Sequence, residues 1–377
     1  MSNPAKLLRE IIALPSVNPA FLPDNHPHAG EQRVADFLAV TAARAGLEVE
    51  FQKVLPNRAN IIARLLPPNK TRQRILLAPH LDTVNVAHES QFSPGTKGGK
   101  IYGRGACDTK GSVAAMLTAL CDLAKSKSRP RETEIVFAGL IDEENAQAGS
   151  RALAKSGLKA DLAIVGEPTR LQVVTAHKGS LWLEMETRGR AAHGATPQFG
   201  RNAVHEMARI VDWLQTDYAA SLKRRRRHPL LGLPTVNVGV ICGGTQANIV
   251  PDHCTITVDR RTLPGETEAS VRREIKKFLQ SKNLSAHMAD KKLAPALPLE
   301  TDHKLPLVRE FLRSIGQTRP LGVHFFCDAA VLSAGGIPSV VFGPGDVAQA
   351  HTADEWISLA QLERAKEVLV RYLKSLP

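Results

Sequence analysis

The sequence contains no long apolar run, and no stretch approaches the ~20 apolar residues that a bilayer-spanning helix needs. The N-terminal stretch Met1–Leu14 carries Arg9 and Glu10 inside a short amphipathic pattern, which is unlike a signal peptide. The five cysteines are scattered, odd in number and without a CxxC pair. This distribution excludes a disulfide framework and a cysteine zinc site, so we expect free thiols in a cytoplasmic protein.

The chain also lacks internal repeats and low-complexity segments, and its 43% hydrophobic content excludes a disordered protein. A length of 377 residues predicts about two domains. Acidic residues are outnumbered, giving a formal net charge of +12. The one dense basic cluster, Lys223–Arg227, contains no aromatic residue, so we interpret it as a solvated loop rather than a nucleic-acid-binding arm. The positive field would attract an anionic small substrate.

Both ends of the sequence show the alternation of an α/β domain. Apolar residues at helical spacing predict helices near residues 4–13, 31–46, 110–124 and 358–375. Short apolar runs, which are typical of buried strands, lie at residues 61–66, 75–78, 135–141, 162–165 and 339–342. These runs predict a mainly parallel sheet surrounded by helices.

The middle of the chain has a different pattern. Strands are predicted near residues 181–187, 235–242, 253–261 and 284–289, and helices near residues 201–222 and 266–281. The order β-α-β-β-α-β is that of a ferredoxin-like split module. We therefore predict an α/β domain, residues 1–174 and 291–377, that is interrupted by an inserted ferredoxin-like α+β domain, residues 175–290.

Metal-ligand residue types follow four of the predicted strands, at the sheet edge where ligands bind in open α/β folds. They are His80 with Asp82, then Glu143 with Glu144, then Glu167, and finally His351. Asp108 adds a carboxylate from the glycine-rich turn Gly103–Gly111, where missing side chains let other groups approach closely. Each residue alone has a structural explanation, such as a helix cap for Asp108. Their convergence on one edge instead predicts a metal centre.

The mixture of imidazoles and carboxylates favours a particular kind of centre. Two divalent ions about 3.5–4 Å apart need one bridging carboxylate, for which Asp108 is the candidate, and further ligands on each side. One histidine per ion with carboxylates favours zinc, with cobalt or manganese as alternatives. Asp82 stands two residues from His80, as expected of a carboxylate that fixes the imidazole. Of Glu143 and Glu144, one can be a ligand while the other accepts a proton as general base.

These residues resemble the motifs of the metallopeptidase M20 family, which are His80-x-Asp82, Gly-Arg-Gly-x-x-Asp108-x-Lys-Gly, Asp-Glu143-Glu144, Gly-Glu167-Pro-Thr and a late His351. The resemblance covers nearly the whole chain, including the inserted domain. It implies that Asp108 bridges two zinc ions. It also implies that His80 and Glu167 complete one ligand set, and that Glu144 and His351 complete the other.

The same resemblance implies that Glu143 is the general base and that Asp82 supports the first histidine. In the family the inserted domain serves for dimerisation and as a lid, and its histidine, matched here by His193, reaches the partner subunit's active site to help hold the developing oxyanion. Gly-Gly-Thr-x-x-Asn248 and Asp-x-Arg261 also match. Asn248 and Arg261 are candidates to hold a substrate carboxylate, although a turn asparagine and a surface arginine are plain structural alternatives.

The resemblance implies a metal-dependent amidohydrolase with a dinuclear zinc centre. Its substrate would be an N-acyl amino acid with a free carboxylate, as for acetylornithine deacetylase. A metallo-carboxypeptidase or dipeptidase, or a desuccinylase, is the alternative within the family. A non-catalytic binding protein with a basic surface is a distant one. We expect a homodimer, a small-molecule substrate, and no membrane or nucleic-acid partner.

Two local features bear on the choice among family members. Cys327-Asp328-Ala329 stands where a threonine or serine is expected before the acidic residue, which weakens assignment to a particular member. The ending Gly-Pro-Gly-Asp346…His351 favours the deacetylase and carboxypeptidase branch over the desuccinylase. Neither feature alters the predicted ligand set.

Overall fold

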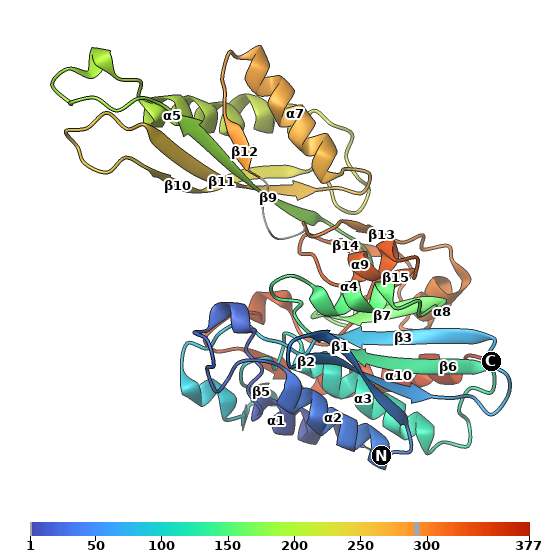
Figure 1. The fold of residues 1–377 in the computed structure, drawn as a ribbon. Helices are drawn as coiled ribbons and strands as arrows, with labels where there is room; N and C mark the ends of the chain where they lie inside the picture. The colour runs from blue at the N-terminus through green and yellow to red at the C-terminus, as the bar shows by residue number, and fades with distance from the viewer. Residues whose placement is uncertain (1, 290–294) are drawn as a thin grey trace. The chain divides into compact units, whose positions relative to one another are not determined.

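Buried apolar strands form the centre of the larger sheet in this computed structural model, which describes residues 2–289 and 295–377 (Figure 1). The sheet has the order β1-β2-β6-β3-β7-β15-β8-β13, with β14 paired to β8. Its strands are β1 (Glu48–Leu55), β2 (Arg58–Leu65), β3 (Gln73–Pro79), β6 (Thr133–Gly139), β7 (Leu162–Gly166), β8 (Val174–His177), β13 (Leu299–Glu300), β14 (Leu321–Val323) and β15 (Ser339–Val341). Strands β6, β3, β7 and β15 run parallel, whereas β1, β2, β8 and β13 join antiparallel. Every residue of β6 and β7 is buried, as expected where helices cover both faces.

The helices around this sheet are α1 (Pro4–Ile12), α2 (Gln32–Arg44), α3 (Lys110–Ala124), α4 (Ala148–Lys155), α8 (Pro306–Ser314), α9 (Ala329–Ala334) and α10 (Leu359–Lys374). A small sheet of order β16-β5-β4 is formed by β4 (Gly95–Lys97), β5 (Lys100–Tyr102) and β16 (Trp356–Ser358). Helix α3 packs against β3, β6 and β7 and is covered by α1 and α10, while α4 and α9 lie on the opposite face of the sheet (Figure 1). All of α3 except Asp122 and Ala124 is buried, because its residues are mostly small or aliphatic.

The predicted helices and strands of this part are confirmed, and α3 begins and ends at the predicted residues. The mainly parallel sheet is confirmed at its centre. Apolar spacing does not predict β1, because its charged residues leave it largely exposed at the antiparallel edge. It does not predict β4, β5, β8 or β16 either, since strands of three or four residues carry no measurable period.

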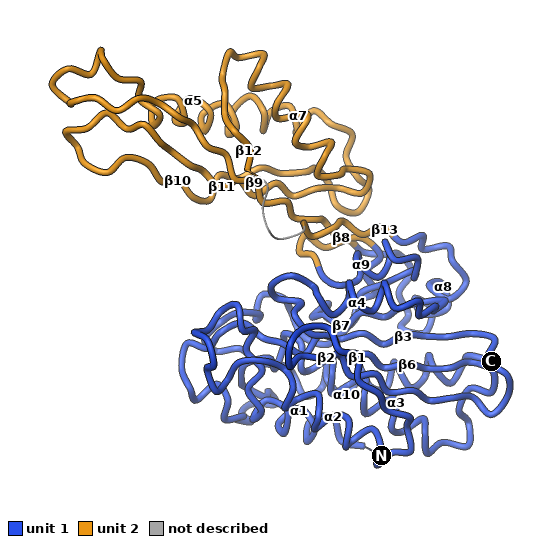
Figure 2. The backbone as a smooth tube through the Cα atoms, viewed as in Figure 1, with its two compact units in different colours: residues 1–175, 301–321, 327–377 blue, residues 176–300, 322–326 orange. Residues whose placement is uncertain are grey.

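Residues 176–300 and 322–326 form a second compact unit, unit 2, distinct from unit 1, which contains residues 1–175, 301–321 and 327–377 (Figure 2). The sheet of unit 2 has the order β10-β11-β9-β12, and all neighbours are antiparallel. Its elements are β9 (Gly179–Arg188), α5 (Ala203–Trp213), a π-helical turn (Leu214–Tyr218), α6 (Ala219–Lys223), β10 (Thr235–Gly243), β11 (His253–Thr262), α7 (Glu268–Ser281) and β12 (His287–Ala289). Helices α5 and α7 supply the apolar side chains that cover this sheet.

Two details of unit 2 differ from expectation. The single helix predicted over residues 201–222 is divided into α5 and α6 by the π-helical turn, where the rings of Trp213 and Tyr218 pack against Phe278. The sequence predicts an insertion over residues 175–290, whereas unit 2 contains residues 176–300 and 322–326. The expected end at residue 290 lies outside the described residues.

Among the described helices, none has both the length and the apolar composition that crossing a membrane requires.

Candidate metal centre

Loops after parallel strands bring the predicted ligands to one edge of the larger sheet. His80 follows β3, Glu144 lies in the loop after β6, and Glu167 follows β7. Asp108 lies just before α3, and His351 lies in the loop between β15 and β16. Because β3, β6, β7 and β15 are parallel, the loops at their carboxyl ends meet at the same edge.

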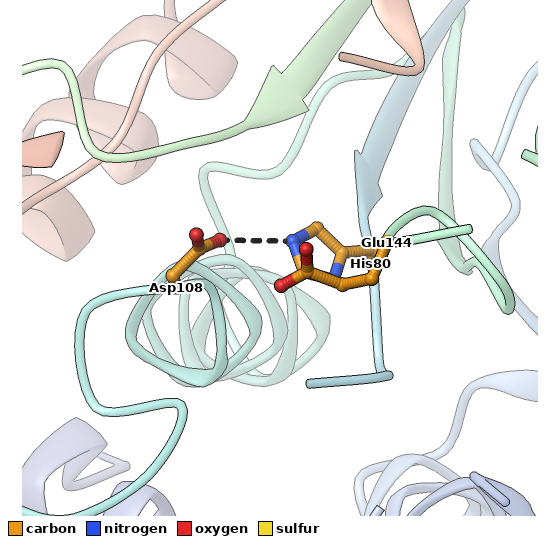
Figure 3. Close-up of side chains that lie close together, drawn as sticks. All are labelled: His80, Asp108 and Glu144. Carbon is orange, nitrogen blue, oxygen red and sulfur yellow. Dashed lines mark hydrogen bonds and ion pairs between the residues drawn. The ribbon is translucent and has the colours of Figure 1, made fainter. Parts of the chain in front are cut away.

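Asp108 offers one carboxylate oxygen to each of the two histidines. Its Oδ1 lies 3.1 Å from His80 Nε2, as Figure 3 shows, and its Oδ2 lies 3.3 Å from His351 Nε2. His80 Nε2 is also 3.9 Å from Glu167 Oε1, and His351 Nε2 is 3.2 Å from Glu144 Oε1. The five residues therefore form two groups that share Asp108.

The helix-cap explanation of Asp108 does not hold. The N-cap residue of α3 is Thr109, and no side chain caps the helix at that position. The Asp108 carboxylate instead faces His80 and His351, and their hydrogen bonds hold its pKa well below the usual value although burial acts in the opposite direction. Gly111 is needed where the turn packs against the start of α3, because a Cβ there would lie 2.6 Å from the Ala106 carbonyl oxygen.

The spacing of these donor atoms fits a pair of divalent ions. Two ligand atoms bound at about 2.0 Å in a tetrahedral site lie roughly 3.3 Å apart. The four distances in the two groups run from 3.1 to 3.9 Å. In addition, His80, Asp108 and Glu144 each place one donor atom within 4.8 Å of the other two (Figure 3). The donor set of the described residues therefore suits zinc and related transition metals.

Electrostatics point the same way, because this edge carries far more buried acid than base. Burial raises the pKa of Glu143 and Glu167 well above the usual value, and burial followed by the charge of Asp108 raises that of Glu144. Burial acts to lower the pKa of His80, but its hydrogen bond to Asp108 helps to bring it well above 6.5. Buried like charges are costly unless cations neutralise them, so bound metal ions would relieve this excess.

Glu143 and Glu144 are adjacent but differ in their contacts. Glu144 bonds His351, whereas no hydrogen bond or ion pair within the described residues engages the Glu143 carboxyl group. Glu143 is 9% exposed, so its carboxyl group is shielded from bulk water without being enclosed. Glu144 therefore lies among the candidate ligand atoms, whereas the Glu143 carboxyl group has no such contact in the described part of the chain.

Asp82 contacts three of the predicted site residues. Its Oδ1 lies 3.4 Å from His80 Nδ1, although the carbonyl oxygen of Asp82 is closer to that nitrogen at 3.0 Å. The same carboxylate accepts hydrogen bonds from the backbone N–H groups of Glu143 (3.1 Å) and Glu144 (3.0 Å). The expected contact with His80 is present, and Asp82 also anchors the turn that carries both glutamates.

Glu355 is a buried acid that motif spacing does not identify. Its carboxylate accepts four hydrogen bonds, from Arg104 Nη1 (2.7 Å) and from the backbone N–H groups of Gly105 (2.9 Å), Cys107 (2.8 Å) and Asp108 (2.9 Å). The glycine-rich turn therefore folds around Glu355, and Gly105 adopts a φ of +81° there. The available signal in the sequence is its position four residues after His351, which is weak because single acids are common in loops.

Asp328 is a second buried acid near the site, only 1% exposed. Its Oδ1 accepts a hydrogen bond from Ser150 Oγ at 2.5 Å, and burial raises its pKa to about 7. Burial, followed by the charge of Glu167, raises the pKa of the neighbouring Cys327 thiol well above 9. A thiol that stays protonated is a poor nucleophile, so Cys327 is not placed to attack a substrate.

His193 and Asn248 lie on adjacent loops of unit 2. His193 forms an isolated bridge with Ile249, and the N–H of Gly194 donates to the carbonyl oxygen of Asn248 at 2.7 Å. A Cβ at Gly194 would lie 3.0 Å from the Asn248 backbone, which explains the glycine. Both His193 and Asn248 are exposed, so they form one accessible loop cluster.

Arg261 lies at the opposite end of the β10–β11 hairpin from Asn248. It pairs with Thr235, the first residue of β10, whereas Asn248 lies in the connection from β10 to β11. The strand from His253 to Arg261 spans roughly 27 Å, so one chain cannot bring both side chains to one carboxylate. Arg261 Nε donates to Asp259 Oδ2 at 3.0 Å. Burial, and after it the charge of Arg261, lowers the pKa of Lys178. Lys178 is a cation near Arg261 that motif spacing does not identify.

The basic run at residues 223–227 is a loop with one anchored member, following α6. Arg225 bonds Glu266 and Glu274, while Lys223, Arg224, Arg226 and Arg227 are exposed. This is the arrangement predicted for a solvated loop.

An α/β sheet whose edge gathers imidazoles and carboxylates in two linked groups is typical of enzymes that use two metal ions. Comparison with known families is specific: the model of peptidase family M20/M25/M40 matches residues 76–375, and the chain belongs to this family. The chain is therefore an amide-bond hydrolase and not the non-catalytic binding protein that its basic charge left open.

Similar proteins support the same placement. The chain is 30% identical to the acetylornithine deacetylase of Proteus mirabilis, over 98% of this chain and 96% of that protein. It is 31% identical to the acetylornithine deacetylase of Myxococcus xanthus, over 89% and 90% of the two chains. Among solved structures, an M20 metallo-carboxypeptidase from Sulfolobus solfataricus has a TM-score of 0.78 at 20% identity, covering 99% of both chains. A dinuclear metal-binding M20 peptidase from Bacillus subtilis has a TM-score of 0.70 at 14% identity, covering 99% of this chain and 97% of that one.

Proposed function

We propose that this chain is an N-acyl amino acid amidohydrolase that holds two zinc ions between His80, Asp108, Glu144, Glu167 and His351. The observation that carries the proposal is that the two carboxylate oxygens of Asp108 face different histidines. Oδ1 lies 3.1 Å from His80 Nε2, and Oδ2 lies 3.3 Å from His351 Nε2. His80 and Glu167 would complete one ligand set, and Glu144 and His351 the other. Cobalt or manganese would fit the same donors.

Bound divalent ions supply Lewis acidity, which polarises an amide carbonyl and brings the pKa of water toward neutrality. Glu143 takes the proton from the attacking water and delivers it to the leaving amine nitrogen. Burial suits it to this role, because the raised pKa of Glu143 makes its carboxyl group a stronger base than an exposed glutamate. Asp82 keeps His80 and the Glu143 backbone in place.

Unit 2 would supply the remaining contacts as a ferredoxin-like lid and dimerisation domain. The exposed apolar residues Val240 and Ile241 on edge strand β10, 57% and 56% exposed, suit pairing with a second copy. In such a homodimer the exposed His193 would reach the partner's site and stabilise the oxyanion there, with Asn248 beside it. Because Arg261 lies far from Asn248 along β11, these two carboxylate-binding candidates would serve different sites.

The proposed substrate is a small N-acyl amino acid with a free carboxylate, as the names of the acetylornithine deacetylase relatives suggest. The net charge of +12 favours an anionic substrate. The dipeptidase and carboxypeptidase alternatives share the same chemistry and differ in the group on the acyl side of the amide bond.

Metal analysis of the purified protein, combined with assays on matched N-acetyl, N-succinyl and dipeptide substrates, tests the proposal. We expect two metal ions per chain and the highest kcat/KM on an N-acetyl amino acid. Chelation should abolish this activity, and added zinc should restore it. Metal-free protein that retains full activity would refute the dinuclear assignment. A preference for dipeptides would instead favour the peptidase alternative.

A further inference from the structure

The turn that carries the proposed general base is held by two buried carboxylates. Its three consecutive backbone N–H groups each donate to one: Asp142 to Glu31 Oε1 (3.1 Å), Glu143 to Asp82 Oδ1 (3.1 Å) and Glu144 to Asp82 Oδ2 (3.0 Å). The three N–H groups lie beyond the end of β6 and have no partner among the described strands of the sheet. Without the two carboxylates, these buried donors would therefore lack acceptors.

The turn needs such anchors because its backbone is strained. Asp142 has a φ of +67°, in the left-handed region that a side chain disfavours. Such a conformation persists when the surroundings over-determine it. The three anchored N–H groups, together with the buried Asp142 side chain, provide that constraint.

Each carboxylate anchor is in turn held by a residue near the N-terminus. The Asn18 side-chain amide donates to Asp82 Oδ2 (2.8 Å) and to Asp142 Oδ1 (3.0 Å), and so joins the anchor to the turn. Arg58 makes a two-pronged bond to Glu31, with Nε to Oε2 at 2.8 Å and Nη2 to Oε1 at 2.6 Å, and its Nη2 also reaches Asp142 Oδ1 at 3.1 Å. Asn18 and Glu31 are fully buried.

We propose that Asn18 and Glu31 are positioning residues for Glu143, which fix the turn from which this carboxyl group projects. Both residues, with Arg58, lie before residue 76, where the match to the family model begins. The N-terminal segment therefore completes a catalytic turn that the family motifs contain only in part. This inference rests on the proposed function for the role of Glu143, but the anchoring itself does not depend on it.

Two nearly isosteric variants test the anchoring. Asn18→Asp keeps the side-chain oxygen that accepts from the Ala20 N–H (3.1 Å). It replaces the amide nitrogen that donates to Asp82 and Asp142 with an oxygen, which repels both carboxylates. Glu31→Gln removes the charge that faces Arg58 and sets an amide nitrogen against an N–H donor, so it breaks this anchor without adding a carboxylate. Measured by hydrogen-exchange mass spectrometry, amides of residues 141–146 should exchange at least about tenfold faster in both variants, while those of α3 keep the wild-type rate and report an intact fold.

Kinetics test the positioning role on the N-acyl amino acid that the wild type hydrolyses. Assayed at saturating zinc, both variants should lose about 10–100-fold in kcat, with KM within about twofold of wild type, because a displaced base slows the chemical step. Gln317→Leu is the matched control. The Gln317 amide also holds a loop backbone, bonding Val173 N–H (2.7 Å) and Val173 O (2.9 Å), but contacts none of the site residues named above.

Unchanged exchange at residues 141–146 in both variants would overturn the proposal. A loss of kcat without faster exchange there would overturn it too, because the turn would then not have been loosened. An equal loss in Gln317→Leu would also overturn it, because that result would reflect a general loss of stability. If the wild type hydrolyses no amide but exchange still responds, the anchoring is supported and the proposed function fails.

Discussion

At the scale of single residues, burial and contacts give chemically identical side chains different roles. Glu143 and Glu144 are neighbours in sequence, yet Glu144 bonds His351 and the Glu143 carboxyl group is left available. The metallopeptidase motif contains both glutamates, and their contacts differ in the way that the roles implied by the resemblance require. Glu355 shows the converse, since no motif marks it although four hydrogen bonds converge on its carboxylate.

Replacing Glu143 with glutamine should abolish proton transfer while leaving the metal ligands intact. We expect kcat to fall by about 10²–10⁴-fold, with two metal ions still bound by elemental analysis. Glu363→Gln, at an exposed position of α10, is the control and should retain wild-type kcat. Full activity of Glu143→Gln would remove this residue from the mechanism.

Replacing Glu355 with glutamine should weaken metal binding although it lies outside the ligand set. All four partners of its carboxylate are donors, so the amide nitrogen of glutamine would face N–H groups and displace the Asp108 turn. A competitive zinc titration should show about 10–100-fold weaker affinity. Glu355→Asp keeps the charge, so its zinc affinity should lie between those of the wild type and Glu355→Gln. Wild-type zinc affinity in Glu355→Gln would contradict this role.

At the scale of elements, length decides what the sequence can reveal. Helix α3 and strands β3, β6 and β7 have clear apolar periods, so their positions follow from residue order. Strand β8 is four residues long, and its burial depends on partners that lie far away in sequence. Its last residue, His177, is fully buried as a consequence.

His177 should make stability depend on pH. Its Nδ1 donates to the Lys178 carbonyl oxygen at 2.9 Å, its Nε2 has no partner among the described residues, and burial lowers its pKa from 6.5 to about 4. Between these values the unfolded chain binds the proton and the folded chain does not, so the free energy of unfolding falls as pH falls through this window. In urea titrations at pH 7.5 and 4.5, the wild type should lose about 2–3 kcal/mol more than His177→Gln. Equal losses would show that His177 is not the group responsible.

At the scale of the whole molecule, the chain comprises two units with separate cores. Unit 1 contains all five proposed metal ligands and Glu143, whereas His193, Asn248 and Arg261 belong to unit 2. A homodimer in which unit 2 serves the partner's site would make each active site depend on both copies.

Subunit mixing tests this dependence directly. Glu143→Gln and His193→Ala should each be nearly inactive alone, because one lacks the base and the other lacks the oxyanion contact. In a mixed dimer, the His193→Ala subunit keeps its own Glu143 and receives His193 from its partner. Mixing after dissociation and reassembly should restore about a quarter of wild-type activity, since about half the dimers are mixed and one of their two sites is complete. No recovery, with dimers present by light scattering, would refute the trans role.

The sequence by itself determined the periodic helices and strands, the α/β class and the residue types of the candidate metal site, because these depend on local spacing and on motifs at strand ends. Tertiary structure alone decided which atoms meet. It divided the Asp108 oxygens between two histidines, placed Glu355 inside the glycine-rich turn, and carried Asn18 and Glu31 from the N-terminal segment to the Glu143 turn. The physical reason is that buried polar groups must find partners, and in a folded chain those partners are chosen by proximity in space rather than along the sequence.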